Sequence, residues 1–141
     1  MSTEPSKVFE RRFQNRLADL NRATEEAVRF IEENGVNGAA VHVANLAIEE
    51  MATNILKYGY DDANAHEILL GVEILPERLL LILEDDGHEF NPLKVPDSVV
   101  DLPAEMRVPG GLGIHLVRRF AEEMRYERRD CRNRLTIAIR R

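Results

Sequence analysis

Apolar and polar residues alternate along this chain with two different periods. Three segments repeat apolar residues every three or four positions, which is the period of a helix with one buried face. The first follows Asn15 as its capping residue and ends at Asn34-Gly35, and Gly59 ends the second. The three predicted helices are the segment between Asn15 and Asn34, the segment from about Gly38 to Tyr58, and Gly111 to Met124.

The other apolar segments are short, which favours strands. Pro76-Glu77 and the run from Asp130 to Asn133 have turn character, so each joins two neighbouring strands into an antiparallel hairpin. The five predicted strands are Lys7 to Phe13 at a sheet edge, HEILLGVEIL, RLLLILED, MRYERR and NRLTIAIRR.

The order is therefore strand, helix, helix, strand, strand, loop, helix, strand, strand. Because the helices must bury their apolar stripes, we expect them on one face of the sheet. This is an α+β fold, a two-layer α/β sandwich whose mixed sheet is mostly antiparallel. We expect one domain over residues 7–141 after a disordered start at 1–6. The chain contains no GxxxxGK[ST] sequence, which argues against a P-loop enzyme.

The segment from His88 to Gly110 has four prolines and no clear period. A loop of this length inside a compact domain is unusual and tends to be functional, often as a lid over a site. We therefore expect this segment to border the functional site.

Composition narrows the choice of class without deciding it. A net charge of −6 argues against a general nucleic-acid binder. Cys131 is the only cysteine, so no internal disulfide can form. No apolar run is long enough to cross a bilayer and the start lacks signal-peptide character, so we expect a cytoplasmic protein with no membrane contact.

Charge is distributed unevenly along the chain. The segment from Arg118 to Arg141 holds nine arginines and four acidic residues, a balance of +5, and the rest of the chain carries −11. The arginines either decorate the solvent side of a helix and a hairpin or form a docking face for an acidic protein.

The sequence IEEMATNILKYGY, from Ile48 to Tyr60, is helical but holds polar residues that a core helix does not need. Glu50 and Asn54 are four residues apart and share one face, whereas Glu49 lies about 140° from Asn54. Lys57 follows one turn later. An acid, an amide oxygen and a cation on one stripe can serve a magnesium-bound phosphate, although a solvated helix face would have the same composition.

Two further motifs follow. In EDDGHEFNP, from Glu84 to Pro92, acids end a very apolar strand, where a buried carboxylate needs hydrogen-bond donors. In PGGLGIHLVRRF, from Pro109 to Phe120, glycines precede a helix whose free N–H groups and dipole favour an anion. Alone, the first is also a plausible turn and the second a plausible loop-to-helix junction.

Taken together, in this order and at these spacings, the three motifs resemble the N, G1 and G2 boxes of the GHKL ATPase superfamily. The resemblance spans roughly Val43 to Ile139 and implies the Bergerat ATP-binding fold. The single short domain, the DxGxxF[ND]P form of the second motif and the GGLG helix resemble the anti-sigma-factor serine/threonine kinases.

The resemblance implies a role for each matching residue. Asn54 is similar to the asparagine that ligates magnesium bound to ATP phosphates, and Glu50 to the acid that orients or deprotonates the attacking hydroxyl. Asp85 resembles the carboxylate that accepts a hydrogen bond from the adenine amino group, beside Gly87, which lets the base approach. The remaining nucleotide contacts implied are Lys57, Tyr58, Arg107, Gly111, Leu112, Gly113 and Thr136.

Two departures from the family pattern are visible. Glu89 replaces the second glycine of the broader DxGxG pattern, and NILKYG follows the histidine-kinase spelling of the first box. A full histidine kinase would need a dimerising helical hairpin with a phosphoacceptor histidine, which the residues before Glu50 do not provide. We interpret His42, His66, His88 and His115 as ordinary surface or core histidines.

The function implied is that of an ATP- and magnesium-dependent serine/threonine protein kinase. It would phosphorylate a STAS-type anti-anti-sigma partner and sequester a sigma factor, as a homodimer that does not itself contact nucleic acid. Two alternatives remain open: a module that binds ATP and a partner without turnover, and a histidine-kinase-like catalytic domain that acts in trans.

Overall fold

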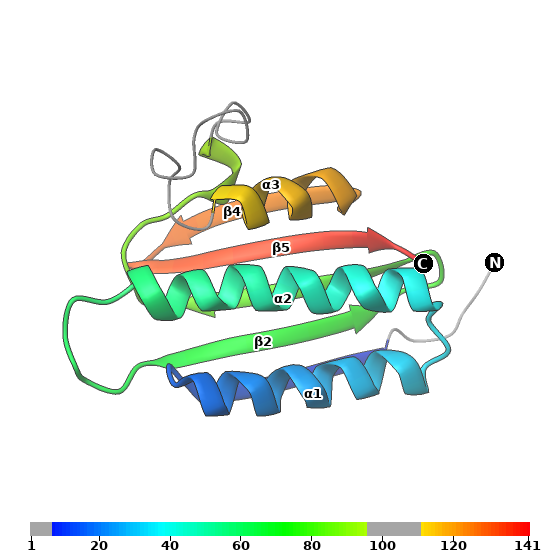
Figure 1. Cartoon of the computed structure of the whole chain (residues 1–141), viewed down its shortest axis with the longest axis horizontal. Coiled ribbons are helices and arrows are strands. Elements are labelled where there is room, and N and C mark those ends of the chain that lie inside the picture. The colour runs from blue at the N-terminus through cyan, green and yellow to red at the C-terminus, as the bar shows by residue number, and fades with distance from the viewer. Residues whose placement is uncertain (1–6, 96–110) are drawn as a thin grey trace.

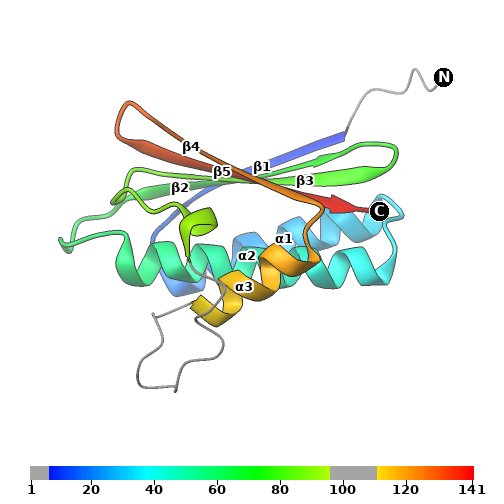
Figure 2. The same cartoon turned by 90° about the horizontal axis from the view of Figure 1, so that it is seen from above.

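The computed structural model of the chain describes residues 7–95 and 111–141 and has two layers (Figure 1). One layer is a five-stranded sheet in the order β1-β2-β3-β5-β4, and the helices cover one face of it (Figure 2). The elements are β1 Lys7–Gln14, α1 Leu17–Glu33, α2 Gly38–Tyr58, β2 Glu67–Ile74, β3 Arg78–Asp85, a 3-10 turn η1 Pro92–Lys94, α3 Gly111–Phe120, β4 Glu123–Arg129 and β5 Arg132–Arg140.

The predicted α+β sandwich and the predicted order of elements are confirmed. One detail differs, because all four neighbouring strand pairs are antiparallel and the sheet is not mixed. The disorder expected for residues 1–6 and most of the expected lid fall outside the described residues.

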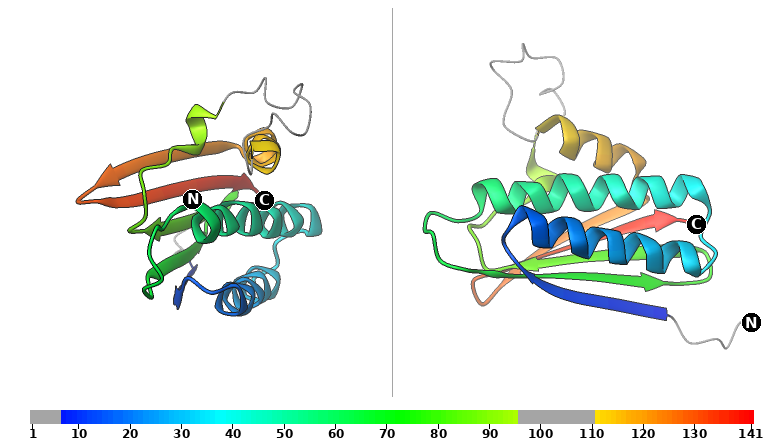
Figure 3. Two further views of the ribbon diagram at one scale, coloured as in Figure 1. Left: turned by 60° about the vertical axis from the view of Figure 1, so that its left-hand side comes forward. Right: turned by 60° about the horizontal axis from the view of Figure 1, so that its bottom comes forward.

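The core lies between the sheet and the helices. Alternate residues of β3 and β5 face the helix layer, so Leu81 and Ile137 are buried in the same core as Ile48 of α2. α1 and α2 run side by side along the sheet, and α3 packs beside α2 (Figure 3). None of the helices within residues 7–95 and 111–141 combines the length and apolar character that crossing a lipid bilayer requires.

The predicted start of the first helix is wrong in its capping residue. The helix begins after Arg16, which makes no side-chain cap. The side-chain oxygen of Asn15 instead accepts a hydrogen bond from the backbone N–H of His66, at 2.9 Å. Asn15 therefore ties the end of β1 to the start of β2 rather than capping the helix.

The predicted end of the third helix is also wrong, because α3 stops at Phe120. Glu123 and Met124 belong to β4 and pair with Ala138 and Ile137 of β5. Sheet pairing along a neighbouring strand outweighs the helical period of a few residues.

The last hairpin turns more tightly than expected. Asp130 and Cys131 alone connect β4 to β5, with φ values of 53° and 61°. Positive φ at both central residues is the geometry of a two-residue hairpin turn that matches strand twist. The short turn places Asn133 inside β5, paired with Asp85, and not in the connection.

Several arginines of the basic C-terminal segment have partners on the protein itself. Arg125 lies 2.8 Å from Glu123, Arg140 lies 3.3 Å from Glu122, and Arg134 pairs with Glu84. These pairs favour a decorated surface for these positions, and a docking face for an acidic protein stays a prediction.

Candidate functional site

A cavity of about 300 Å³ opens beside the C-terminal half of α2. Its walls come from α2, the end of β3, the middle of β4, the start of β5 and the loop that follows β3. The volume is at the lower end for small-ligand pockets, so it would enclose one ring system rather than a large ligand. The lining residues are Met51, Asn54, Ile55, Tyr58, Gly59, Leu83, Asp85, His88, Glu89, Phe90, Pro92, Tyr126, Asn133 and Leu135.

Asp85 ends β3 at the inner wall of this cavity and is only 4% exposed. Its carboxylate accepts hydrogen bonds from the backbone N–H of Gly87, at 2.9 Å, and from the side-chain N–H of Asn133, at 3.0 Å. Burial raises the pKa of Asp85, and the two hydrogen bonds act in the opposite direction. The result is a buried acceptor, held in place, at the wall of an apolar cavity.

Gly87 is required by close packing of two backbone segments. A Cβ atom at this position would lie 2.7 Å from the carbonyl oxygen of Gly59 and 3.0 Å from the Asp85 carboxylate. The next residue, His88, donates its backbone N–H to the same Gly59 carbonyl at 2.9 Å. The loop after β3 is therefore fixed against the end of α2, so the space that a Gly87 side chain would take is filled by protein backbone and not by the cavity.

Asn133 is a site residue that the sequence reasoning missed. It is 6% exposed, and besides Asp85 its side-chain N–H reaches the backbone oxygen of His88 at 2.7 Å. Its side-chain oxygen accepts from Arg128, at 2.9 Å, and from the Tyr126 hydroxyl, at 2.5 Å. Asn133 thus connects β3, β4, β5 and the loop after β3.

Thr136 does not lie at the cavity. It pairs with Ile82 and faces away from the helices, whereas Leu135 pairs with Leu83 and lines the cavity. Strand alternation was the signal that could have corrected this choice, because Asn133 shares its parity with the inward-facing Leu135. We therefore assign the position beside Asp85 to Asn133 and not to Thr136.

A second group of polar residues joins the loop between α2 and β2 to the loop after β3, next to Asp85. The His66 ring stacks on Tyr60, with ring centroids 4.1 Å apart. It lies 2.8 Å from the Asp62 carboxylate and 3.3 Å from that of Asp86. Hydrogen bonding to Asp62, with Asp86 adding to it, raises the pKa of His66. This histidine is therefore an ion-pair link between loops and not an ordinary surface residue.

At the other end, α2 presents the stripe of the first motif. Asn54 lines the cavity, and its side-chain nitrogen is buried with no hydrogen-bond partner among the described residues. Glu50 lies one turn earlier. A Cβ atom on Gly113 would overlap the Glu50 carboxylate, so the start of α3 packs directly on this acid. The structure thus brings the first and third motifs together.

The remaining predicted residues are placed less closely. Tyr58 lines the cavity and is 52% exposed, while Lys57 is exposed beside it and does not line the cavity. Gly111 and Leu112 form the first turn of α3. Arg107 lies outside the described residues.

The residues present fit ATP and magnesium in specific ways. The Asn54 atom that lacks a partner among the described residues is the amide nitrogen, a donor that could meet a phosphate oxygen, and the oxygen of the same amide is the kind of atom that magnesium binds. No group of three His, Cys, Asp or Glu in the described ranges could hold a metal ion by itself. A magnesium ion here would therefore depend on phosphate oxygens and water for most of its ligands, as magnesium commonly does.

Two curated relatives are similar in sequence. The serine/threonine-protein kinase BtrW of Bordetella bronchiseptica is 26% identical over 92 residues, which are 65% of this chain and 65% of that protein. The serine-protein kinase RsbW of Bacillus velezensis is 28% identical over 91 residues, which are 58% of this chain and 54% of that protein. The match therefore spans less than two thirds of the length of either relative.

A family comparison covers more of the chain. Residues 13–139 match the histidine kinase-like ATPase domain, a span that includes α2, β3, α3 and β5. The resemblance inferred from the three motifs is thereby confirmed at the level of the family. This chain belongs to the histidine kinase-like ATPase domain family.

Proposed function

We propose that this chain is an ATP-dependent serine/threonine protein kinase and an anti-sigma factor. One observation carries the proposal: α2 links the cavity that holds Asp85 to Glu50, which packs against the start of α3. This arrangement supports a base site in the cavity, a phosphate site at the start of α3 and Glu50 as the catalytic acid. The names of the two relatives, both protein kinases, support a protein hydroxyl as the acceptor.

Adenine would occupy the cavity with its amino group donating to Asp85. Guanine has no donor at that position, so the same contact selects against it. Gly87 would serve the base indirectly, because its missing side chain lets the loop after β3 pack on Gly59 and its backbone N–H holds the Asp85 carboxylate. The half-exposed ring of Tyr58 would flank the nucleotide at the cavity mouth.

The phosphates would extend from the cavity toward the start of α3. Backbone N–H groups of Gly111, Leu112 and Gly113 point to the N-terminal end of that helix, where the dipole favours negative charge. Asn54 would bind Mg²⁺, which supplies charge neutralisation when bound to the phosphates. Lys57, and Arg107 from the segment before α3, would add positive charge.

The transfer step needs one acid in position. The serine or threonine oxygen forms a bond to the γ-phosphorus while the bond from that phosphorus to the bridging oxygen breaks and ADP leaves. Glu50 orients the hydroxyl and accepts its proton, which then passes to solvent. Positioning and charge neutralisation supply most of the rate enhancement in phosphoryl transfer. Glu50 would therefore contribute mainly by holding the attacking hydroxyl in position.

The acceptor would be a STAS-type anti-anti-sigma protein, and a sigma factor would be the sequestered client, in the cytoplasm and with the chain as a homodimer. A phosphate adds about −1.5 to −2 charges to the acceptor. Because this chain is itself acidic, at −6, the phosphorylated acceptor would be repelled and released. Release of the acceptor would leave the chain free to bind the sigma factor.

The test is transfer of radiolabel from ATP to the STAS protein encoded nearest to this chain, with magnesium present. We expect wild type to label a serine or threonine, Glu50→Ala to lose about 10²- to 10⁴-fold in rate, and Glu49→Ala to keep the wild-type rate. Absence of transfer by wild type, or full transfer by Glu50→Ala, would contradict the proposal. Tight ATP binding without transfer would favour the sequestering module, and an acid-labile phosphohistidine would favour the histidine-kinase alternative.

A further inference from the structure

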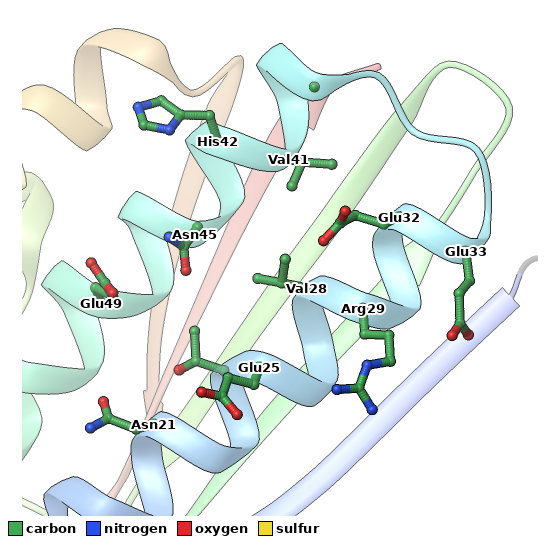
Figure 4. A pocket seen from close by; sticks show the side chains of 12 residues that line it. Asn21, Glu25, Val28, Arg29, Glu32, Glu33, Val41, His42, Asn45 and Glu49 are labelled. Atoms are coloured by element: carbon green, nitrogen blue, oxygen red, sulfur yellow. The ribbon is translucent and has the colours of Figure 1, made fainter.

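A second concave surface, with no lining residue in common with the nucleotide cavity, lies between α1 and α2. This groove has a volume of about 1100 Å³. Val28 and Val41 form an apolar part of its floor, and Glu32 and Glu49 stand along its sides (Figure 4). None of these four side chains takes part in the proposed kinase chemistry.

The lining residues follow helical spacing on both helices, which defines the shape of the groove. On α1 they recur at positions 21, 24 and 25, 28 and 29, and 32 and 33, and on α2 at 38, 41 and 42, 45, and 49. The two stripes therefore span residues 21–33 and 38–49, or about 16 to 18 Å of helix each. The two antiparallel stripes therefore form a straight trough of about three turns, the shape that accepts a third helix.

The charge of the groove is strongly negative. Four glutamates line it, against Arg29 as the only arginine or lysine among the lining residues. No ion-pair partner for any of the four lies within residues 7–95 and 111–141. The four are Glu25, Glu32, Glu33 and Glu49.

The spacing of these acids limits what they can bind. Glu25 and Glu32 are seven residues apart, which places them on the same face of α1 about 10 Å from one another. A single metal ion cannot join carboxylates at that distance, and the described residues contain no group able to hold one. A rigid cationic partner with charges two helical turns apart would meet both.

We propose that this groove docks a basic amphipathic helix of a DNA-binding protein partner. The apolar face of that helix would lie on Val28 and Val41, and lysines or arginines two turns apart would pair with Glu25 and Glu32. DNA-binding proteins carry such helices because phosphates require cationic side chains, so the groove would compete with DNA for the same residues. The identity of the partner as the sequestered sigma factor rests on the proposed function, whereas the helix chemistry rests on the groove.

The described helices of this chain do not suit the groove of a second copy. α1 and α2 form the groove itself, and α3 is packed against α2 with its arginines in the last turn only. The occupant therefore belongs to another protein. Docking here would leave the nucleotide cavity open, because that cavity is lined by the C-terminal part of α2 and by the sheet.

The probe is a designed, fluorescently labelled helical peptide of about 18 residues, with an apolar stripe and lysines two turns apart. Fluorescence anisotropy should show that Glu25→Gln/Glu32→Gln raises its Kd about tenfold or more and weakens the salt dependence of binding. The matched control, Glu10→Gln/Glu77→Gln, removes the same charge from exposed positions outside the groove and should change the Kd less than about twofold. Glu49 is left intact because it adjoins Glu50.

A peptide of the same composition with its apolar stripe scrambled should bind about as weakly to wild type as the helical peptide binds to the double variant. Equal binding of both peptides, or equal loss in both double variants, would mean nonspecific charge attraction and would overturn the proposal. Label transfer to the STAS protein is measured on Glu25→Gln/Glu32→Gln in parallel and should equal wild type. If Glu25→Gln/Glu32→Gln keeps label transfer and binds the peptide as wild type does, the groove proposal alone is overturned. If the peptide binds the groove but wild type transfers no label, the kinase proposal alone is overturned.

Discussion

At the end of the cavity where we propose that the base binds, Asp85 accepts hydrogen bonds from Gly87 and Asn133, whereas at the proposed phosphate end the Asn54 amide nitrogen has no partner in the described chain. The base end is completed by bonds within the protein. The phosphate end has an unused amide and a carboxylate, Glu50, pressed against the start of a helix. The two ends of the cavity therefore differ in whether their polar groups already have hydrogen-bond partners within the protein before a ligand binds.

The difference has a physical reason. A buried carboxylate is costly unless donors surround it, so Asp85 must be held by permanent neighbours such as Gly87 and Asn133. Phosphates and magnesium bring their own charge, and a site for them must keep hydrogen-bond donors free for phosphate and oxygen atoms free for magnesium. Substitutions at the two ends should therefore separate nucleotide affinity from the rate of transfer.

Among the changes that separate the two ends of the cavity, Gly113→Ala should have the largest effect and should act mainly on the rate of transfer. The added methyl group overlaps the Glu50 carboxylate, a flexible group that would swing aside without unfolding the protein. Misplacing a catalytic group by about 1 Å costs on the order of 10²-fold in rate. Single-turnover transfer assays should show that loss, with the ATP Kd within about threefold of wild type by calorimetry. A rate equal to wild type would mean that Glu50 is not positioned by the start of α3.

Asp85→Asn should act at the base end and change affinity. It removes a charged acceptor, whose hydrogen bond contributes about 1.5–3 kcal/mol, so the ATP Kd should rise roughly ten- to a hundredfold. Because burial raises the pKa of Asp85, wild-type affinity should also fall as the pH decreases through that pKa, and the variant should lose this dependence. Calorimetry at several pH values measures both effects.

The neighbouring Glu84→Gln is the control for that experiment. Glu84 pairs with Arg134 on the opposite face of β3, so its loss should leave the ATP Kd unchanged within about twofold. An unchanged Kd in Asp85→Asn would mean that the base does not bind in this cavity.

Much of this architecture could be predicted because the relevant signals are periodic and long. The 21-residue helix that carries Glu50 and Asn54 was predicted with its observed bounds, and the hairpin around Pro76-Glu77 is confirmed. The placement of Asp85 at the end of an apolar strand also followed, because a strand that alternates with the core ends where the polar loop begins.

What could not be predicted depends on contacts between distant segments. Asn15 was expected to cap a helix, yet a backbone donor 51 residues away takes its oxygen. Asn133 was placed in a turn because the two-residue turn at Asp130 was unrecognised, and a shift of that kind changes which residues of a strand face the cavity. Local propensity carries no information about either partner.

Asn133→Ala tests whether the base end depends on this missed residue. The change leaves the Asp85 carboxylate and the His88 carbonyl each short of a donor, which costs about 1–3 kcal/mol when groups are buried. We expect the free energy of unfolding to fall by that amount and the ATP Kd to rise by up to about tenfold. Thr136→Val, on the other face of β5, should change neither beyond about 0.5 kcal/mol. The reverse ranking would restore Thr136 as the residue beside the base.

The smallest effect should come from the histidine link at the base end. The pKa of His66 is raised and that of Asp62 is lowered, each chiefly by the hydrogen bond between them. A raised histidine pKa gives stability that is fully present below the unfolded value of about 6.5 and is lost as the pH rises through the folded value. Asp62 contributes stability above its unfolded pKa, and this is lost as the pH falls through its lowered folded pKa.

Urea unfolding of wild type and His66→Gln should therefore differ most at mildly acidic pH and converge at about pH 9. A difference that is constant from about pH 5.5 to about pH 9 would show that His66 acts through its stacking on Tyr60 and not through its charge.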